Sequence, residues 1–207
     1  IGVGTGNYKD GVMEQLANKG NGIYEYIDNV AQGKKVFVYE FNKFYTIAKD
    51  VKVQKEFNTK IVKAYRLIGY ENRLLAKEDF KNDKKDAGDL SLGQTVTALY
   101  EIIPQTAAYE VLPTFTIDFR YKEIDKEISE AMRLDVFDNR QSFEKSSENM
   151  RFAASVAAFG MVLRNSEYKG EANYDKVKQW ASSAMTYNPY NFKTELMSLI
   201  DKARRLK

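Results

Sequence analysis

Alternating apolar and polar residues in the middle of the chain constrain its fold most strongly. In the segment TFTIDFRY, aromatic and aliphatic side chains occupy every second position, which is the period of a β-strand with two different faces. The apolar set is Phe115, Ile117, Phe119 and Tyr121, and the polar set is Thr114, Thr116, Asp118 and Arg120. TIAKDVKVQKEF and EAMRLDVF alternate in the same way. We therefore predict an antiparallel β-sandwich over residues 45–145, in a fold of the α+β class.

Residues 1–44 have the pattern of a different architecture. IGVG is typical of a short buried strand, NYKDGVMEQLANKG of a helix and GIYEYID of a second strand. Asp28 or Asn29 is expected to cap a further helix. The apolar side of that helix would carry Val30, Phe37, Phe41 and Phe44. These elements predict the last part of an α/β domain.

The chain begins at Ile1, inside the first of these strands, with neither an initiator Met nor a signal peptide. We therefore expect a fragment of a longer protein. Truncated parallel strands would leave open edges and apolar surface, so residues 1–44 are expected to pack on the sandwich or to pair with a second copy.

After residue 145 the apolar period becomes helical, which predicts a C-terminal helical subdomain over residues 146–207 packed on the sandwich. Ser146 or Ser147 is expected to cap a helix that ends at Leu163 and is apolar on nearly all sides. Asn173 should cap a second helix, and a third follows Pro189. Trp180 lies at apolar helical spacing, so we expect it in the core rather than in a ligand site.

Composition excludes several classes of site. The chain has no Cys and no His, which excludes nucleophilic machinery built on Cys–His or Ser–His–Asp, zinc sites with these ligands and disulfides. The formal net charge of +3 arises from 32 basic and 29 acidic residues mixed along the chain, so nucleic acid is not an expected partner. No apolar run approaches the roughly 20 residues that span a bilayer.

Two motifs suggest ligand sites but have simpler explanations. In IGVGTGN, Gly2, Gly4 and Gly6 are evenly spaced and do not form the dinucleotide fingerprint, so a tight turn between strand and helix is favoured over phosphate binding. The loop over residues 79–89 gathers four acidic residues that could attract calcium. They are Asp79, Asp83, Asp86 and Asp89. Their spacing does not fit an EF-hand and lysines lie among them, so a solvated connection is favoured.

Two other kinds of chemistry remain open. A hydrolase based on carboxylates could use the segment Tyr70–Glu71–Asn72–Arg73 and Glu101, although Glu71 and Arg73 are better explained as a structural ion pair. Binding to an anionic surface could use the lysine-rich loop together with Arg204, Arg205 and Lys207.

Long segments resemble one bacterial family. These are GVGTGNYKDGVMEQLANKGNGIYEYID, AKDVKVQKEFN, YRLIGYENRLL, EDFKNDKKDAGDLSLGQTVTALYE and RFAASVAAFGMVLRNSEYKG. They are similar to von Willebrand factor A-domain proteins that carry an uncharacterised conserved C-terminal domain. The resemblance implies that residues 1–44 are the last elements of the A domain and that the remainder is the C-terminal domain.

The resemblance also implies a cation site in the A domain, built on an Asp-x-Ser-x-Ser loop that would precede this segment. The nearest match is Asp89–Leu90–Ser91–Leu92–Gly93, but it ends in glycine and falls in the predicted sandwich. We therefore assign no metal ligand, no cofactor-binding residue and no catalytic residue to this chain, and expect Mg or Ca only in the intact A domain.

The function expected from these observations is a non-catalytic interaction or scaffold module, not an enzyme. Its partner would be an unknown protein, with possible self-association through residues 1–44. The resemblance implies a location in the bacterial cell envelope or at the cell surface.

Overall fold

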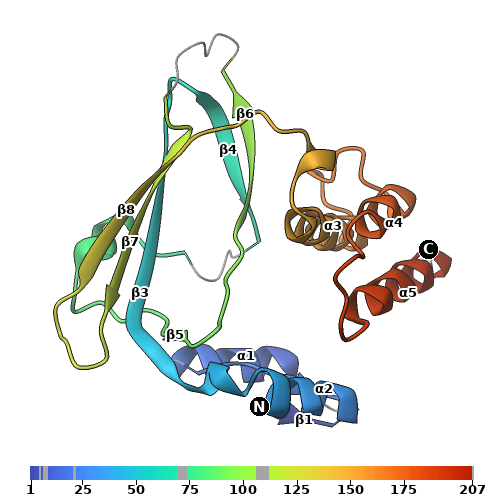
Figure 1. The fold of residues 1–207 in the computed structure, drawn as a ribbon, viewed down its shortest axis with the longest axis horizontal. Coiled ribbons are helices and arrows are strands. Elements are labelled where there is room, and N and C mark those ends of the chain that lie inside the picture. Colours follow the sequence, from blue (N-terminus) through green and yellow to red (C-terminus); the bar gives the residue numbers. More distant parts are fainter. Residues whose placement is uncertain (5, 7–8, 21, 70–73, 106–111, 207) are drawn as a thin grey trace. The chain divides into compact units, whose positions relative to one another are not determined.

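A computed structural model describes residues 1–4, 6, 9–20, 22–69, 74–105 and 112–206. The chain divides into two compact units (Figure 1). The first consists of Ile1–Ala64, Tyr70–Val96 and Ile102–Phe137, and the second of Tyr65–Gly69, Thr97–Glu101 and Asp138–Lys207. None of the helices in the described ranges has the length and apolar character needed to span a membrane.

The chain starts with a small parallel α/β element. β1 (Gly2–Val3) pairs in parallel with β2 (Tyr26–Ile27), and α1 (Asp10–Lys19) lies between them in the sequence. Gly4 and Gly6 after β1 have φ angles of 113° and 106°, which L side chains rarely adopt. Both positions therefore favour glycine, while the turn between strand and helix stays a prediction, because residues 5, 7 and 8 of this connection lie outside the described residues.

The predicted helix over residues 30–44 is helical but irregular. α2 (Val30–Lys34) begins at Asn29, whose side chain accepts a hydrogen bond of 2.9 Å from the backbone N–H of Gln32, as predicted for the cap. A π-helix (Lys35–Tyr39) and a 3₁₀ helix (Phe41–Phe44) follow. The β-branched residues around Phe37 disfavour a regular α-helix, which explains the departure.

The first unit is centred on a four-stranded antiparallel sheet with the order β5-β3-β7-β8. The strands are β3 (Thr46–Phe57), β5 (Leu90–Ser91), β7 (Phe115–Lys122) and β8 (Glu130–Val136). Two further strands, β4 (Val62–Ile68) and β6 (Leu99–Pro104), form a separate two-stranded sheet. Antiparallel sheets in a mixed α and β fold confirm the broad class. The stacked arrangement of a sandwich stays a prediction, as do the proposed domain limits.

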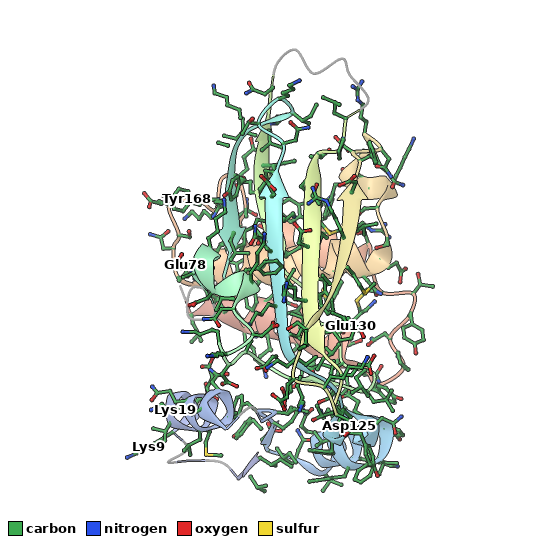
Figure 2. The ribbon with its side chains drawn as sticks, turned by 90° about the vertical axis from the view of Figure 1, so that its left-hand side faces the viewer. Lys9, Lys19, Glu78, Asp125, Glu130 and Tyr168 are labelled. Atoms are coloured by element: carbon green, nitrogen blue, oxygen red, sulfur yellow. The ribbon has the colours of Figure 1, made fainter. Side chains whose placement is uncertain are left out.

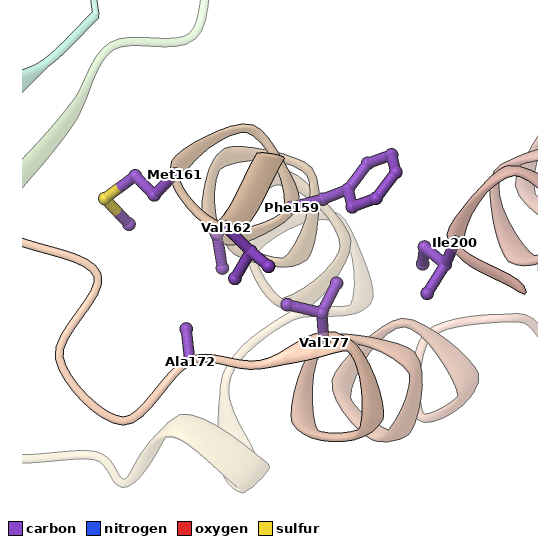
Figure 3. Close-up of a cluster of buried hydrophobic side chains, with 7 residues drawn as sticks. Phe159, Met161, Val162, Ala172, Val177 and Ile200 are labelled. Carbon is purple, nitrogen blue, oxygen red and sulfur yellow. The ribbon is translucent and has the colours of Figure 1, made fainter. Parts of the chain in front are cut away.

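The second unit contains three α-helices around a compact apolar cluster (Figure 3). The helices are α3 (Glu148–Leu163), α4 (Tyr174–Ser182) and α5 (Phe192–Arg205). Val177 of α4 and Ile200 of α5 are fully buried against Phe159 and Val162 of α3. Trp180 packs at the edge of this cluster, as its spacing predicted.

The predicted caps of two of these helices are confirmed. Ser147 accepts a hydrogen bond from the N–H of Met150, and Asn173 accepts one from Lys176. Part of the apolar surface of α3 is exposed in the second unit. Val156 and Leu163 are 44% and 48% exposed.

Candidate interaction surface

The register of the large sheet collects apolar side chains on one face. Phe119 lies opposite both Val53 and Met132, and Ile117 lies opposite Leu134. We call this surface the apolar sheet face; its members are Val53, Phe57, Phe115, Ile117, Phe119, Tyr121, Met132, Leu134 and Val136. The alternation in TFTIDFRY thus predicted correctly which side chains share a face.

The apolar sheet face is the more exposed of the two faces. Val53 is 61% exposed, and Met132 and Leu134 are each 60% exposed, while the other members are half-buried. On the opposite face, Lys52 and Lys122 are only 3% and 6% exposed. An alternating strand normally buries its apolar side, so this sheet reverses the expected pattern.

The loop over residues 79–89 folds over the polar face of the sheet, which explains why the lysines on that face are buried. Lys52 donates from Nζ to the backbone oxygen of Asn82, 2.5 Å away, and Lys122 donates to the backbone oxygen of Asp83 at 2.8 Å. Lys122 also pairs with Asp50 at 2.7 Å. Buried ammonium groups are tolerated only where acceptors replace water, and this loop provides them.

Asp83 fixes the loop to two strands. Its carboxylate accepts hydrogen bonds from Ser129 Oγ at 2.6 Å and from the Arg120 guanidinium at 2.9 Å. The hydrogen bonds from Ser129 and Arg120 lower the pKa of Asp83 to about 2. Burial raises the pKa of Asp50, but its hydrogen bonds with Lys122 and the Ala87 N–H outweigh that effect and lower it overall.

The expectation of a solvated loop over residues 79–89 is wrong in part. A 3₁₀ helix (Lys77–Lys81), in which Glu78 is labelled in Figure 2, places Phe80 in a buried position with 7% exposure. Asp89 accepts a hydrogen bond from the backbone N–H of Asp50. Among the residues that the structure describes, no group of three acidic side chains is arranged to hold a metal ion. The acids of the loop make contacts within the chain.

Lys55 lies in the middle of the apolar sheet face, opposite Ile117. Its ammonium group is 3.6 Å from the ring centroid of Phe115 and 4.8 Å from that of Phe57. These cation–π contacts hold one positive charge among aromatic side chains. Burial lowers the pKa of Lys55. An arriving carboxylate would find here a cation that is already partly desolvated.

The structure describes the other candidate sites only in part. Glu101 is bonded to Arg66 in an ion pair, and the segment 70–73 lies outside the described residues. Arg204 pairs with Asp175 at 2.6 Å, which neutralises part of the basic C-terminal end, and Lys207 is also outside the described residues.

Comparison with known proteins identifies the family. Residues 42–115 and 110–206 match the family described as "Uncharacterized protein YfbK, C-terminal". The chain belongs to this family. It is also 38% identical over 219 residues to "Uncharacterized protein YfbK" of Escherichia coli (strain K12), a match that covers 98% of the chain and 38% of that protein. The chain thus spans well under half the length of this relative, and no solved structure matches it significantly.

Proposed function

We propose that the chain is a non-catalytic protein–protein interaction or scaffold module of a bacterial von Willebrand factor A-domain protein. The observation that carries the proposal is the exposure of the apolar sheet face. Val53, Met132 and Leu134 remain mostly exposed while lysines on the other face are buried. A contiguous apolar surface of this kind marks an interaction site more often than an inert one, because covering it removes apolar area from water.

Lys55 suggests the chemistry of the partner. Lys55 places one positive charge within the face, 3.6 Å from the ring centroid of Phe115, so charge complementarity favours a partner segment with a negative charge at this position. A segment with one acidic side chain among aliphatic or aromatic residues would cover the face and pair with Lys55. Ion pairs of this kind set register and specificity more than affinity.

Residues 1–44 are proposed to complete an A domain. The parallel pairing of β1 and β2 supports this, as does the start of the family match at residue 42. Val3, Leu16 and Val30 are 73%, 60% and 87% exposed, which fits a segment that needs further α/β elements or a second copy to cover it. In this proposal any Mg or Ca belongs to the intact A domain, and the location is the cell envelope or surface.

A crosslinking experiment tests the apolar sheet face. A photoreactive phenylalanine at position 53, in cells that express the full-length protein, should yield a specific crosslinked protein, and the same residue at position 206 should not. Val53 and Leu206 are both exposed, at 61% and 88%. The captured protein is then purified and its affinity measured.

Val53→Lys should weaken this affinity about tenfold or more, because it places a second cation in the apolar contact, whereas Leu206→Lys should leave it unchanged. Circular dichroism establishes that both variants fold. Equal binding by the two variants would refute the assignment of this face, as would equal crosslinking from both positions.

A further inference from the structure

β8 forms the open edge of the large sheet. It pairs with β7 on one side, and no strand in the described part of the chain pairs with its other side. Six of its seven residues, from Glu130 to Asp135, are exposed. Its free backbone groups can therefore bond to another strand without any rearrangement of the sheet.

The sequence of this edge is complementary to itself. In Met132–Arg133–Leu134–Asp135–Val136, a basic and an acidic residue flank Leu134 symmetrically. We propose that β8 pairs with β8 of a second copy of this chain, antiparallel and about a two-fold axis at Leu134. Arg133 of each copy then lies opposite Asp135 of the other, and Met132 lies opposite Val136.

Charge selects this register over its neighbours. Directly opposite residues in an antiparallel pair must share a face, so the axis can only pass through a residue of the strand. An axis at Arg133 would place two guanidinium groups opposite each other, and an axis at Asp135 two carboxylates. Like charges directly opposite are destabilising, whereas opposite charges stabilise the pair. Leu134 is thus the centre that brings both charge pairs into contact.

The inference does not depend on the proposed function, because it concerns the strand edge and not the sheet face. Pairing through β8 would nevertheless change the surroundings of the apolar sheet face. Edge pairing would join two four-stranded sheets, so that Met132 and Leu134 of both copies would meet at the seam. The dimer would present two copies of the apolar sheet face, which would let it bind two partner segments at once.

A charge exchange tests the pairing. The chain is examined by analytical ultracentrifugation at concentrations from about 1 µM to about 100 µM, because a single short edge buries less area than a stable dimer interface. Arg133→Glu should weaken the dimer about tenfold, because both charge pairs become repulsive; Asp135→Lys should do the same. The double variant Arg133→Glu/Asp135→Lys restores both pairs with exchanged signs and should recover the dimer.

Two controls distinguish pairing through the β8 edge from unfolding of the variants and from association through the apolar sheet face. Arg133 also contacts Asp118 at 3.4 Å within the chain, so thermal melts must show that the single variants remain folded. Val53→Lys changes the face but not the edge, and it should leave the dimer intact. A wild-type chain that stays monomeric at the highest concentration would overturn the proposal. A dimer that the single variants do not weaken, or that the double variant does not recover, would also overturn it.

Discussion

At the scale of single residues, the carboxylate of Asp83 holds the loop over residues 79–89 on the large sheet through Arg120 and Ser129. Its pKa is lowered to about 2 in the folded chain, against about 3.9 for an aspartate in an unfolded chain. A lowered pKa means that the ionised form stabilises the fold. This stabilisation is complete above about pH 4 and is lost as the pH falls through about 2.

Asp83→Asn should therefore lower the free energy of unfolding at neutral pH, and the difference from the wild type should shrink as the pH falls from about 4 towards 2. Urea titrations at several pH values measure this difference. Asparagine preserves the shape of the side chain, so the pH dependence isolates the charge. A difference that stays constant over this range would contradict the assigned role.

Ile200 and Leu199 form a matched pair in α5. Ile200 is fully buried against the helical cluster, and Leu199 is 47% exposed. Ile200→Ala should cost about 2 to 5 kcal/mol of unfolding free energy, because it removes buried methyl groups and leaves a cavity. Leu199→Ala should cost less than about 1 kcal/mol. Similar losses for both variants, measured by chemical denaturation, would mean that α5 is oriented differently.

At the scale of elements, the start of α3 depends on one side chain. The Ser147 hydroxyl accepts a hydrogen bond of 3.2 Å from the N–H of Met150. Ser147→Ala should lower the stability of the second unit by about 1 kcal/mol, whereas Ser147→Asp should retain it, because a carboxylate caps equally well. Thermal denaturation followed at 222 nm compares the three chains, and equal stability of the alanine variant would show that the cap is dispensable.

Local features of these elements were predictable from the sequence. Caps such as Ser147 and Asn173 act over three residues, and strand alternation acts over two, so both are visible in a short window. The exposed side of the sheet was not predictable, because it depends on Asp83 reaching Arg120 across 37 positions. The available signal was Phe80, a large apolar residue within a highly charged loop that indicated an anchored segment.

At the scale of the whole molecule, the compact units do not follow the order of the sequence. Segments of β4 and β6 belong to the second unit together with the three helices. Within that unit, Ile68 packs on the apolar cluster, and Arg66 donates to the backbone oxygen of Tyr168 at 3.0 Å. Periodicity predicted a domain limit at residue 145, which stays a prediction. Contacts between distant segments, such as that of Arg66 with Tyr168, leave no periodic trace in the sequence.

This arrangement predicts a selective effect of a strand mutation on distant helices. Ile68→Ala should reduce hydrogen-exchange protection of the α3 amides by about 1 to 3 kcal/mol, because it removes apolar contacts from the cluster of the second unit. Protection in β7 should not change.

Ile103→Ala provides the control, since Ile103 lies in the β6 segment of the first unit and is 55% exposed. If Ile68→Ala lowered protection in β7 as much as in α3, the two units would unfold as one. If it affected neither, the β4 segment would contribute nothing to the helical cluster, and residues 138–206 should then be stable as a separate fragment.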